Sequence, residues 1–224
     1  MQLPRFVLRV FPSATFLIGF FLPLFTSGAS AEDVGRPELL FREDWAATPA
    51  QLPVDQSHVA HPDLQLHLHG PSRDLIKKSH HDQPADDPHY IWSGRCAVGN
   101  WAVSLERLTG AFDLTGQAKV RWRTKQSGFR TLRIMVRTAE GQWLVGHLGD
   151  DASRDWRIRE FNMIDMQWRN LLIETVVEED PVLTDPDLSR ITHIGFTDLM
   201  LGGNSRACSR LDWIEVYAHP SSTE

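Results

Sequence analysis

Short β-rich runs separated by turn residues recur along most of the chain, and this rhythm is the feature that most limits its fold. Within residues 118–125, small or apolar side chains alternate with Lys and Arg. Residues 131–137 show the same period of two, which buries one face of an antiparallel strand and leaves the other in water. Glycine-containing turns fall between the runs, and no stretch keeps a helical period beyond two turns.

The positions of the runs define the expected architecture. Strands are predicted at residues 38–41, 64–69, 90–93, 101–105, 118–124, 131–138, 143–148, 156–161, 171–177, 191–196 and 211–217. About eleven strands in one domain predict an all-β fold, a two-sheet jelly-roll β-sandwich. In the last run Ile214 and Val216 share one face, and Leu211, Trp213 and Tyr217 share the other. Apolar residues on both faces place this strand in the middle of the sandwich.

Residues 1–31 have the pattern of a signal peptide. Arg5 and Arg9 precede an apolar run at residues 14–25, and Ala29-Ser30-Ala31 matches a small-residue cleavage site. An uncleaved membrane anchor is the alternative, but the run is short for a span and contains proline. No similar stretch follows, so no transmembrane segment is expected in the mature chain.

Removal of residues 1–31 leaves a single predicted sandwich domain at 32–224 that is secreted or periplasmic. The net charge of −6 then becomes −8, because the two removed charges are both arginines. An acidic chain of this kind argues against nucleic acid as the main partner. Cys96 and Cys208 are the only cysteines, and in an exported protein they predict one disulfide. A metal-binding or catalytic thiol is the alternative, but the chain has no C-x-x-C spacing.

Three separated pieces resemble a known family. They are FDLTG followed by AKVRWRT from residue 112, THIGF with LDWIEVY near the C-terminus, and LLFREDW at residues 39–45. They are similar to the strands of galactose-binding-like jelly-roll modules, which bind carbohydrate in secreted bacterial proteins. The resemblance implies a jelly-roll fold and a carbohydrate partner. The family's ligand residues cannot be placed here, because residues 64–99 match none of its motifs.

The same resemblance implies a structural calcium between the first and last strands. Glu43 and Asp44 follow the opening strand, and Asp212 lies in the closing one. Carboxylate oxygens suit Ca²⁺ in an extracellular protein. Arg210 or a backbone N–H is the alternative partner for Asp212.

A histidine-rich segment, residues 61–89, holds six of the ten histidines. The period of two places His67 and His69 on one strand face, where two imidazoles can share a transition-metal ion, with His80 as a third ligand. Alternatively a histidine acts as a general base, or the segment is simply polar surface. If the protein is an enzyme, the candidate catalytic residues are His67, His69, His81 and Tyr90.

Arginine and tryptophan supply the remaining candidate ligand-binding residues. If their strands are neighbours, four arginines form a cationic face that suits an anionic glycan: Arg121, Arg123, Arg133 and Arg137. The alternative is a solvated face neutralised by acids such as Glu106 and Glu160. Of the eight tryptophans, Trp122 and Trp156 are expected in the core. Trp92, beside the histidine-rich segment, is expected to face a sugar ring.

These features favour a secreted protein that binds a polysaccharide or glycan, and the arginines suit an anionic one. The first alternative is a polysaccharide lyase or glycosidase-like enzyme on the same scaffold. A lyase needs a base and cations, whereas a glycosidase needs two facing carboxylates. The second alternative is a non-catalytic structural envelope protein.

Overall fold

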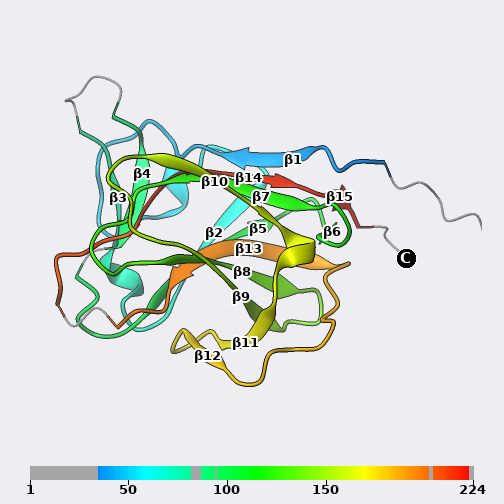
Figure 1. The fold of residues 1–224 in the computed structure, drawn as a ribbon. Helices are drawn as coiled ribbons and strands as arrows, with labels where there is room; N and C mark the ends of the chain where they lie inside the picture. The colour runs from blue at the N-terminus through cyan, green and yellow to red at the C-terminus, as the bar shows by residue number, and fades with distance from the viewer. Residues whose placement is uncertain (1–34, 82–86, 94, 202–203, 222–224) are drawn as a thin grey trace, which may run out of the picture. The chain divides into compact units, whose positions relative to one another are not determined.

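The structure is a computed structural model that describes residues 35–81, 87–93, 95–201 and 204–221. In these residues the strands form two antiparallel sheets, one of six strands and one of nine. The two sheets lie one above the other as layers (Figure 1). The predicted all-β, two-sheet jelly-roll sandwich is therefore confirmed.

The six-stranded sheet has the order β10-β7-β14-β4-β3, and β1 also pairs with β14. The bounds are β1 (Leu39–Glu43), β3 (Ile76–Ser79), β4 (Tyr90–Ser93), β7 (Lys119–Thr124), β10 (Arg157–Asn162) and β14 (Arg210–Tyr217). The prediction that the last strand lies inside its sheet is confirmed, because β14 pairs with β7 on one side and with β1 and β4 on the other.

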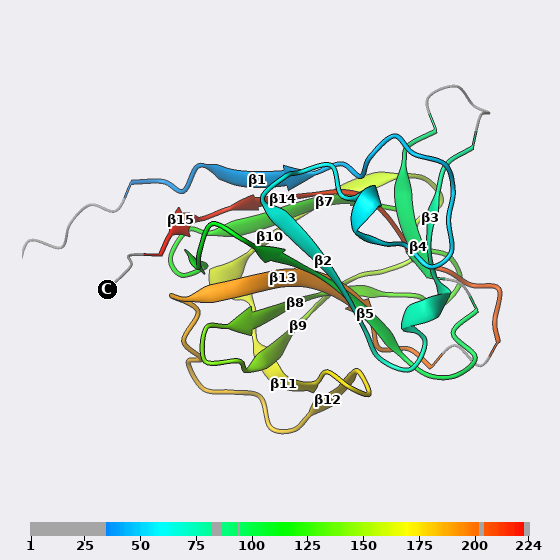
Figure 2. The same ribbon diagram turned by 180° about the vertical axis from the view of Figure 1, so that it is seen from behind.

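The nine-stranded sheet has the order β12-β11-β9-β8-β13-β5-β2, with β6 beside β13 and β15 beside β6. Its β2 and β5 are easiest to follow from behind (Figure 2). The bounds are β2 (Leu64–His69), β5 (Trp101–Arg107), β6 (Phe112–Asp113), β8 (Leu132–Thr138), β9 (Trp143–Asp150), β11 (Trp168–Leu172), β12 (Val177–Glu179), β13 (Ile191–Asp198) and β15 (His219–Pro220). Three single-turn 3₁₀ helices complete the described elements: η1 (Gln56–His58), η2 (Arg73–Leu75) and η3 (Met163–Asp165).

The main core fills the space between the two sheets. Trp122 and Ile214 of the six-stranded sheet belong to the same buried cluster as Val103 and Phe196 of the nine-stranded one. Trp122 is fully buried, as predicted, and its Nε1 donates to Asp150 Oδ2 over 3.0 Å. Because β9 carries Asp150, this bond joins the two sheets through a satisfied buried polar group.

Arginines cover the outer side of β14. Ile214 and Val216 point into the core, whereas Trp213 lies on the outer side with only 7% of its surface exposed. The guanidinium carbon of Arg42 lies 4.4 Å from the Trp213 ring centroid, and that of Arg121 lies 6.0 Å away. Cation–π contacts thus shield the outer apolar residue that the sequence places there.

A second, smaller core lies on the outer face of the nine-stranded sheet, meaning the face turned away from the six-stranded sheet. Residues 171–177, predicted as one strand, instead contain the end of β11, a turn at residues 173–176 and the start of β12. We call this turn the covering segment. Its Val176 is fully buried against Ala102, Met135 and Val145. Asn100 Nδ2 donates to Val176 O over 2.8 Å and holds the segment against β5.

The predicted disulfide is wrong. Cys96 and Cys208 are both buried, and the structure contains no bond between them. Sγ of Cys208 lies 3.6 Å from Ser127 Oγ, and burial raises the pKa of the Cys96 thiol. A buried thiol of this kind behaves as a small apolar side chain rather than as a cross-link.

The predicted signal peptide, residues 1–31, lies outside the described residues. Within the described ranges, no helix is both long enough and apolar enough to cross a membrane.

Candidate functional site

Strand pairing aligns a row of polar and aromatic residues across the outer face of the nine-stranded sheet. Glu106 on β5 is opposite His193 on β13, and His193 is opposite Arg137 on β8. Arg137 is in turn opposite Trp143 on β9. Ser104 lies two residues before Glu106 on the same face of β5, and His67 on β2 is opposite Ser104. Five neighbouring strands therefore contribute side chains to one surface.

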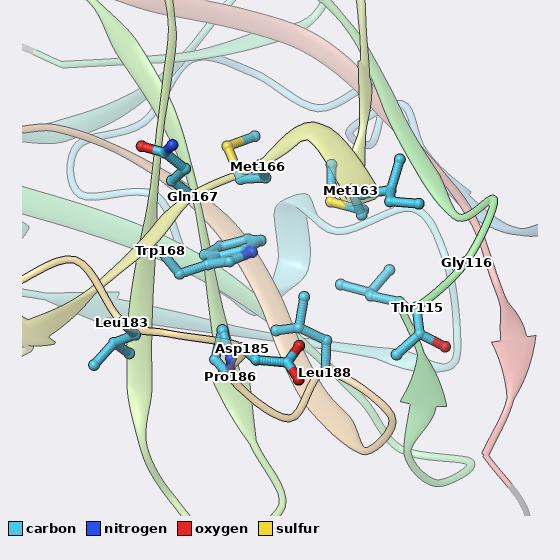
Figure 3. A pocket seen from close by; sticks show the side chains of 12 residues that line it. Thr115, Gly116, Met163, Met166, Gln167, Trp168, Leu183, Asp185, Pro186 and Leu188 are labelled. Atoms are coloured by element: carbon cyan, nitrogen blue, oxygen red, sulfur yellow. The ribbon is translucent and has the colours of Figure 1, made fainter.

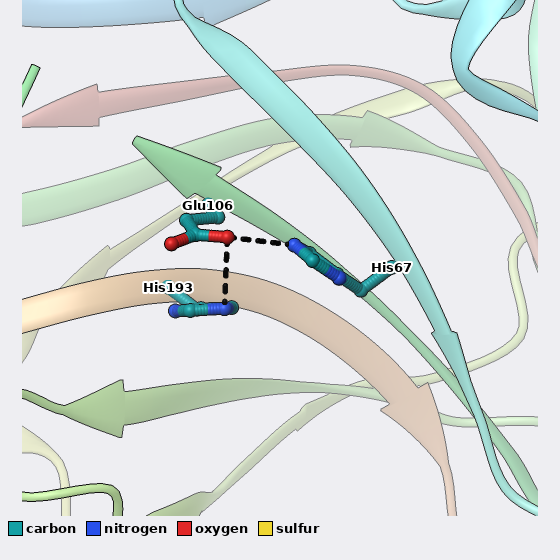
Figure 4. A group of neighbouring side chains, drawn as sticks. All are labelled: His67, Glu106 and His193. Atoms are coloured by element: carbon teal, nitrogen blue, oxygen red, sulfur yellow. Dashed lines mark hydrogen bonds and ion pairs between the residues drawn. The ribbon is translucent and has the colours of Figure 1, made fainter. Parts of the chain in front are cut away.

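Three of these residues, together with His69 opposite Ala102, form what we call the histidine cluster: His67, His69, Glu106 and His193. Glu106 lies between two imidazoles (Figure 4). Its Oε2 is 2.8 Å from His67 Nε2 and 3.6 Å from His193 Nε2. The ring centroids of His67 and His193 are 5.1 Å apart. His69 stacks on His67 with centroids 6.3 Å apart, and its Nε2 is 2.9 Å from Ser104 Oγ.

Two imidazoles of the cluster are held neutral. Burial, followed by the nearby His67, lowers the pKa of His69 to about 4. Burial also lowers the pKa of His193 to about 4, although Glu106 opposes this change. Both rings are therefore uncharged near neutral pH, where a neutral imidazole can accept a hydrogen bond or bind a metal.

Trp143 and Arg137 extend the cluster along the row. The half-buried Trp143 ring meets His69 edge-on at 4.9 Å and His193 at 5.4 Å between centroids. The guanidinium carbon of Arg137 lies 5.9 Å from the Trp143 ring centroid. In the described part of the chain, no carboxylate lies within ion-pair distance of Arg137. The row thus combines an aromatic ring, a cation, a carboxylate and neutral imidazoles.

The structure brings together only part of the metal set expected from sequence. His67 and His69 share a face, as predicted, but His80 follows β3 in the other sheet. There the His80 ring stacks on His89 with centroids 4.1 Å apart. The neighbours of His67 are instead Glu106 and His193, which sequence reasoning missed. Only the strand order and register could have indicated these two residues. A residue on β13 comes close to β2 only when β5 lies between the two strands in the correct register.

The four candidate catalytic residues separate into two pairs. His67 and His69 belong to the histidine cluster. Tyr90 and His81 lie at the β3–β4 end of the six-stranded sheet, where Tyr90 Oη is 3.2 Å from His81 Nδ1. Asp87 Oδ2 lies 2.8 Å from the same nitrogen. Burial raises the pKa of Tyr90, and the phenol is therefore protonated near neutral pH.

The four predicted ligand-binding arginines do not form one face, because β7 and β8 belong to different sheets. On β7, Arg121 Nη1 donates to Glu215 over 3.2 Å and Arg123 Nη1 donates to Asp212 over 2.7 Å. Glu160 is a further partner of Arg121. This face matches the alternative in which acids neutralise the cations.

The other two arginines lie on the outer face of the nine-stranded sheet. Arg133 Nη2 donates to Glu178 over 2.7 Å, and its Nε donates to Gly146 O. Arg137 is the one of the four that faces the histidine cluster.

The three carboxylates of the predicted calcium site have separate partners. Fully buried Glu43 accepts backbone N–H bonds from Trp45, Ala60 and His61, although burial still raises its pKa. Asp44 pairs with Arg42, and Asp212 pairs with Arg123. Asp212 thus has an arginine partner, and the three do not form a convergent oxygen cage.

Trp92 and the pocket beside η3 both lie apart from the histidine cluster. Trp92 lies on β4 in the six-stranded sheet, 5.9 Å from Lys77 Nζ, and is not part of the histidine cluster. A pocket of about 370 Å³ lies beside η3. Met163, Met166, Trp168 and Leu188 line it (Figure 3). It contains none of the candidate site residues, although Leu114, Thr115 and Gly116 of the FDLTG motif help to line it.

Among known proteins, the chain has matches in solved structures only. No family model matches the chain, and no curated protein matches it. A family 11 carbohydrate-binding module of a Clostridium thermocellum cellulosomal cellulase is similar in structure, with a TM-score of 0.46, 12% identity, and coverage of 80% of this chain and 100% of that one. A family 29 carbohydrate-binding module gives a TM-score of 0.43, 14% identity, and coverage of 77% and 91%.

A third similar structure is the agarase AgWH50C, with a TM-score of 0.40 and 11% identity. The match covers 79% of this chain and 25% of the agarase.

Proposed function

We propose that this protein binds carbohydrate on the outer face of its nine-stranded sheet, at the row that runs from Glu106 through His193 and Arg137 to Trp143. The observation that carries the proposal is the position of Trp143, a half-buried indole surrounded by hydrogen-bonding side chains. The C–H-rich face of a sugar ring stacks on an indole, while its hydroxyl groups need donors and acceptors at the rim.

The second support is the contrast between the two outer faces. On the six-stranded sheet, Arg121 and Arg123 are occupied by Glu215 and Asp212. On the nine-stranded sheet, Glu106 keeps about a third of its side chain exposed, and Arg137 faces the cluster without an acidic partner among the described residues. Polar groups that are positioned but not fully used are the ones available to a ligand.

Replacing Trp143 with alanine is expected to weaken glycan binding by about tenfold or more, since a central aromatic contact contributes roughly 1.4–2 kcal/mol to binding. A glycan array on the full chain identifies the ligand, and titration calorimetry measures the affinities. The matched control is Trp92→Ala, which removes a tryptophan from the other sheet and leaves affinity unchanged. Wild-type affinity in Trp143→Ala, or a loss confined to Trp92→Ala, would contradict the proposed site.

The ligand is proposed to carry an acidic group, with Arg137 as its partner. Arg137→Gln is then expected to lower the affinity for a carboxylated or sulfated glycan about tenfold, because a charge-assisted hydrogen bond contributes roughly 1.5–3 kcal/mol. The variant also loses the weakening of binding by added salt. Arg121→Gln is the control, since Glu215 already occupies that cation. The acidic ligand would be contradicted if the wild type and Arg137→Gln both bound a neutral glycan with the same affinity at low and high salt. The ligand would then be a neutral glycan that stacks on Trp143.

A further inference from the structure

We propose that His67, Glu106 and His193 bind a divalent transition-metal ion, leaving an open coordination position toward solvent. Within the described residues, these three are a group whose potential ligand atoms all lie within 4.8 Å of one another. Two imidazoles and one carboxylate form a donor set that suits zinc and its first-row neighbours better than Ca²⁺ or Mg²⁺. The metal site shares Glu106 and His193 with the proposed carbohydrate row, but the test below measures zinc binding without any glycan.

The distances are close to those of an occupied site. Metal–ligand bonds of about 2.0–2.1 Å in a tetrahedral site place neighbouring ligand atoms about 3.3 Å apart. Glu106 Oε2 lies 2.8 Å from His67 Nε2 and 3.6 Å from His193 Nε2, one distance slightly below that value and one slightly above it. Shifts of a few tenths of an ångström bring both to the expected separation.

A second contact orients His193 as a ligand. Thr192 Oγ1 donates its single proton to Arg137 O over 3.3 Å. Its oxygen therefore accepts the bond from His193 Nδ1, 2.9 Å away, so that the proton of the neutral ring lies on Nδ1. The lone pair of Nε2 then faces the Glu106 carboxylate with no hydrogen between the two acceptors. A bound cation satisfies both atoms, and such support of the far ring nitrogen is usual for metal-ligating histidines.

The position of the group favours an accessible site on a rigid base. Each ligand comes from a different paired strand, β2, β5 or β13, so sheet hydrogen bonds fix the spacing. The side chains of His67 and Glu106 are 31% and 34% exposed, whereas His193 is 6% exposed. The ion therefore sits at the surface with a coordination position for water or another oxygen ligand. His69 is excluded from the ligand set because its Nε2 contacts Ser104 Oγ.

The test is zinc binding by the full chain after treatment with EDTA and dialysis. Titration calorimetry with Zn²⁺ is expected to give one ion per chain in the wild type. His67→Ala, Glu106→Gln and His193→Gln should each weaken the affinity by more than about tenfold, since even outer contacts of metal sites change it by that factor. His69→Asn is the matched control, because it removes an adjacent imidazole of the same cluster and should leave affinity and stoichiometry unchanged.

Thermal unfolding supplies a second readout that also verifies folding of each variant. Zinc should raise Tm of the wild type and of His69→Asn by mass action, and should raise Tm of Glu106→Gln by clearly less at the same zinc concentration. Glu106→Gln retains the size and position of the side chain, so a folded variant is available even if a histidine variant fails to fold. The proposal is overturned if the wild type binds no stoichiometric zinc, if Glu106→Gln binds it normally, or if His69→Asn loses it as His67→Ala does.

Discussion

Replacing Gly195 with alanine is expected to destabilise the protein by about 3 kcal/mol or more. A Cβ atom at this position would lie 2.0 Å from Val103 O and 2.7 Å from Ser104 Cα. Both contacts are with the backbone of β5, which cannot rotate away as a side chain can. β13 lies between β5 and β8, so relief of the overlap must separate strands in the middle of the nine-stranded sheet.

Urea denaturation of wild type and Gly195→Ala measures this loss. Gly35→Ala is the control, since a Cβ there meets no atom within 4 Å and its φ is not in the left-handed region; a change within about 0.5 kcal/mol is expected. An unchanged midpoint for Gly195→Ala would mean that β5 and β13 tolerate a wider spacing. Because these strands carry Glu106 and His193, the variant should also lose zinc binding.

Asp198→Ala is expected to lower the free energy of unfolding by about 3–5 kcal/mol, which is the usual effect of removing one partner of a buried ion pair. Arg130 and Asp198 are both fully buried, and Arg130 Nη1 lies 3.2 Å from Asp198 Oδ2. Arg130 also donates to Met200 O and Ala207 O. The pair thus joins the end of β13 to the chain that leads into β14. With alanine at 198, a guanidinium remains in the interior without its counter-charge.

A double-mutant cycle with Arg130→Met separates the ion pair from the other contacts. The double variant is expected to be more stable than the sum of the two single losses predicts, by about 1–3 kcal/mol, because it no longer buries an unpaired charge. Free energies from urea denaturation supply all four corners of the cycle. Additivity within about 0.5 kcal/mol would mean that the two side chains act independently.

The fold is largely predictable from local pattern. Alternation in residues 118–124 places Trp122 in the core and the cations on the outside, and the structure agrees. No run predicts the short strands β3, β6 and β15, and Trp156, expected in the core, is only half-buried. The run at residues 171–177 was read as one strand because its composition is β-rich, but Val176 has a φ of 55°. A β-branched residue in the left-handed region is rare, and its burial against the second core overrides its local preference.

The candidate site is only half predictable, because it depends on pairings between distant strands. Alternation alone puts His67 and His69 on one face. His193 reaches that face because the register of β13 against β8 shifts between Ile191 and His193. The irregularity lets Ile191 and Ile194 both point into the core while His193 points outward. Glu106 was expected to neutralise an arginine, and its actual neighbours follow from β5 lying between β2 and β13.

The covering segment limits the orientation in which a long ligand can lie on the outer face of the nine-stranded sheet. It packs over Ala102, Met135 and Val145. These residues lie to one side of the row, toward the C-terminal end of β2 and the N-terminal end of β5. A long polymer laid parallel to the strands would run into Val176 after passing the imidazoles. One laid perpendicular to the strands, from β2 toward Trp143, follows the row and does not cross the covering segment. The proposed glycan chain therefore crosses the strands, and its repeat length along that axis selects which sugar unit stacks on the indole.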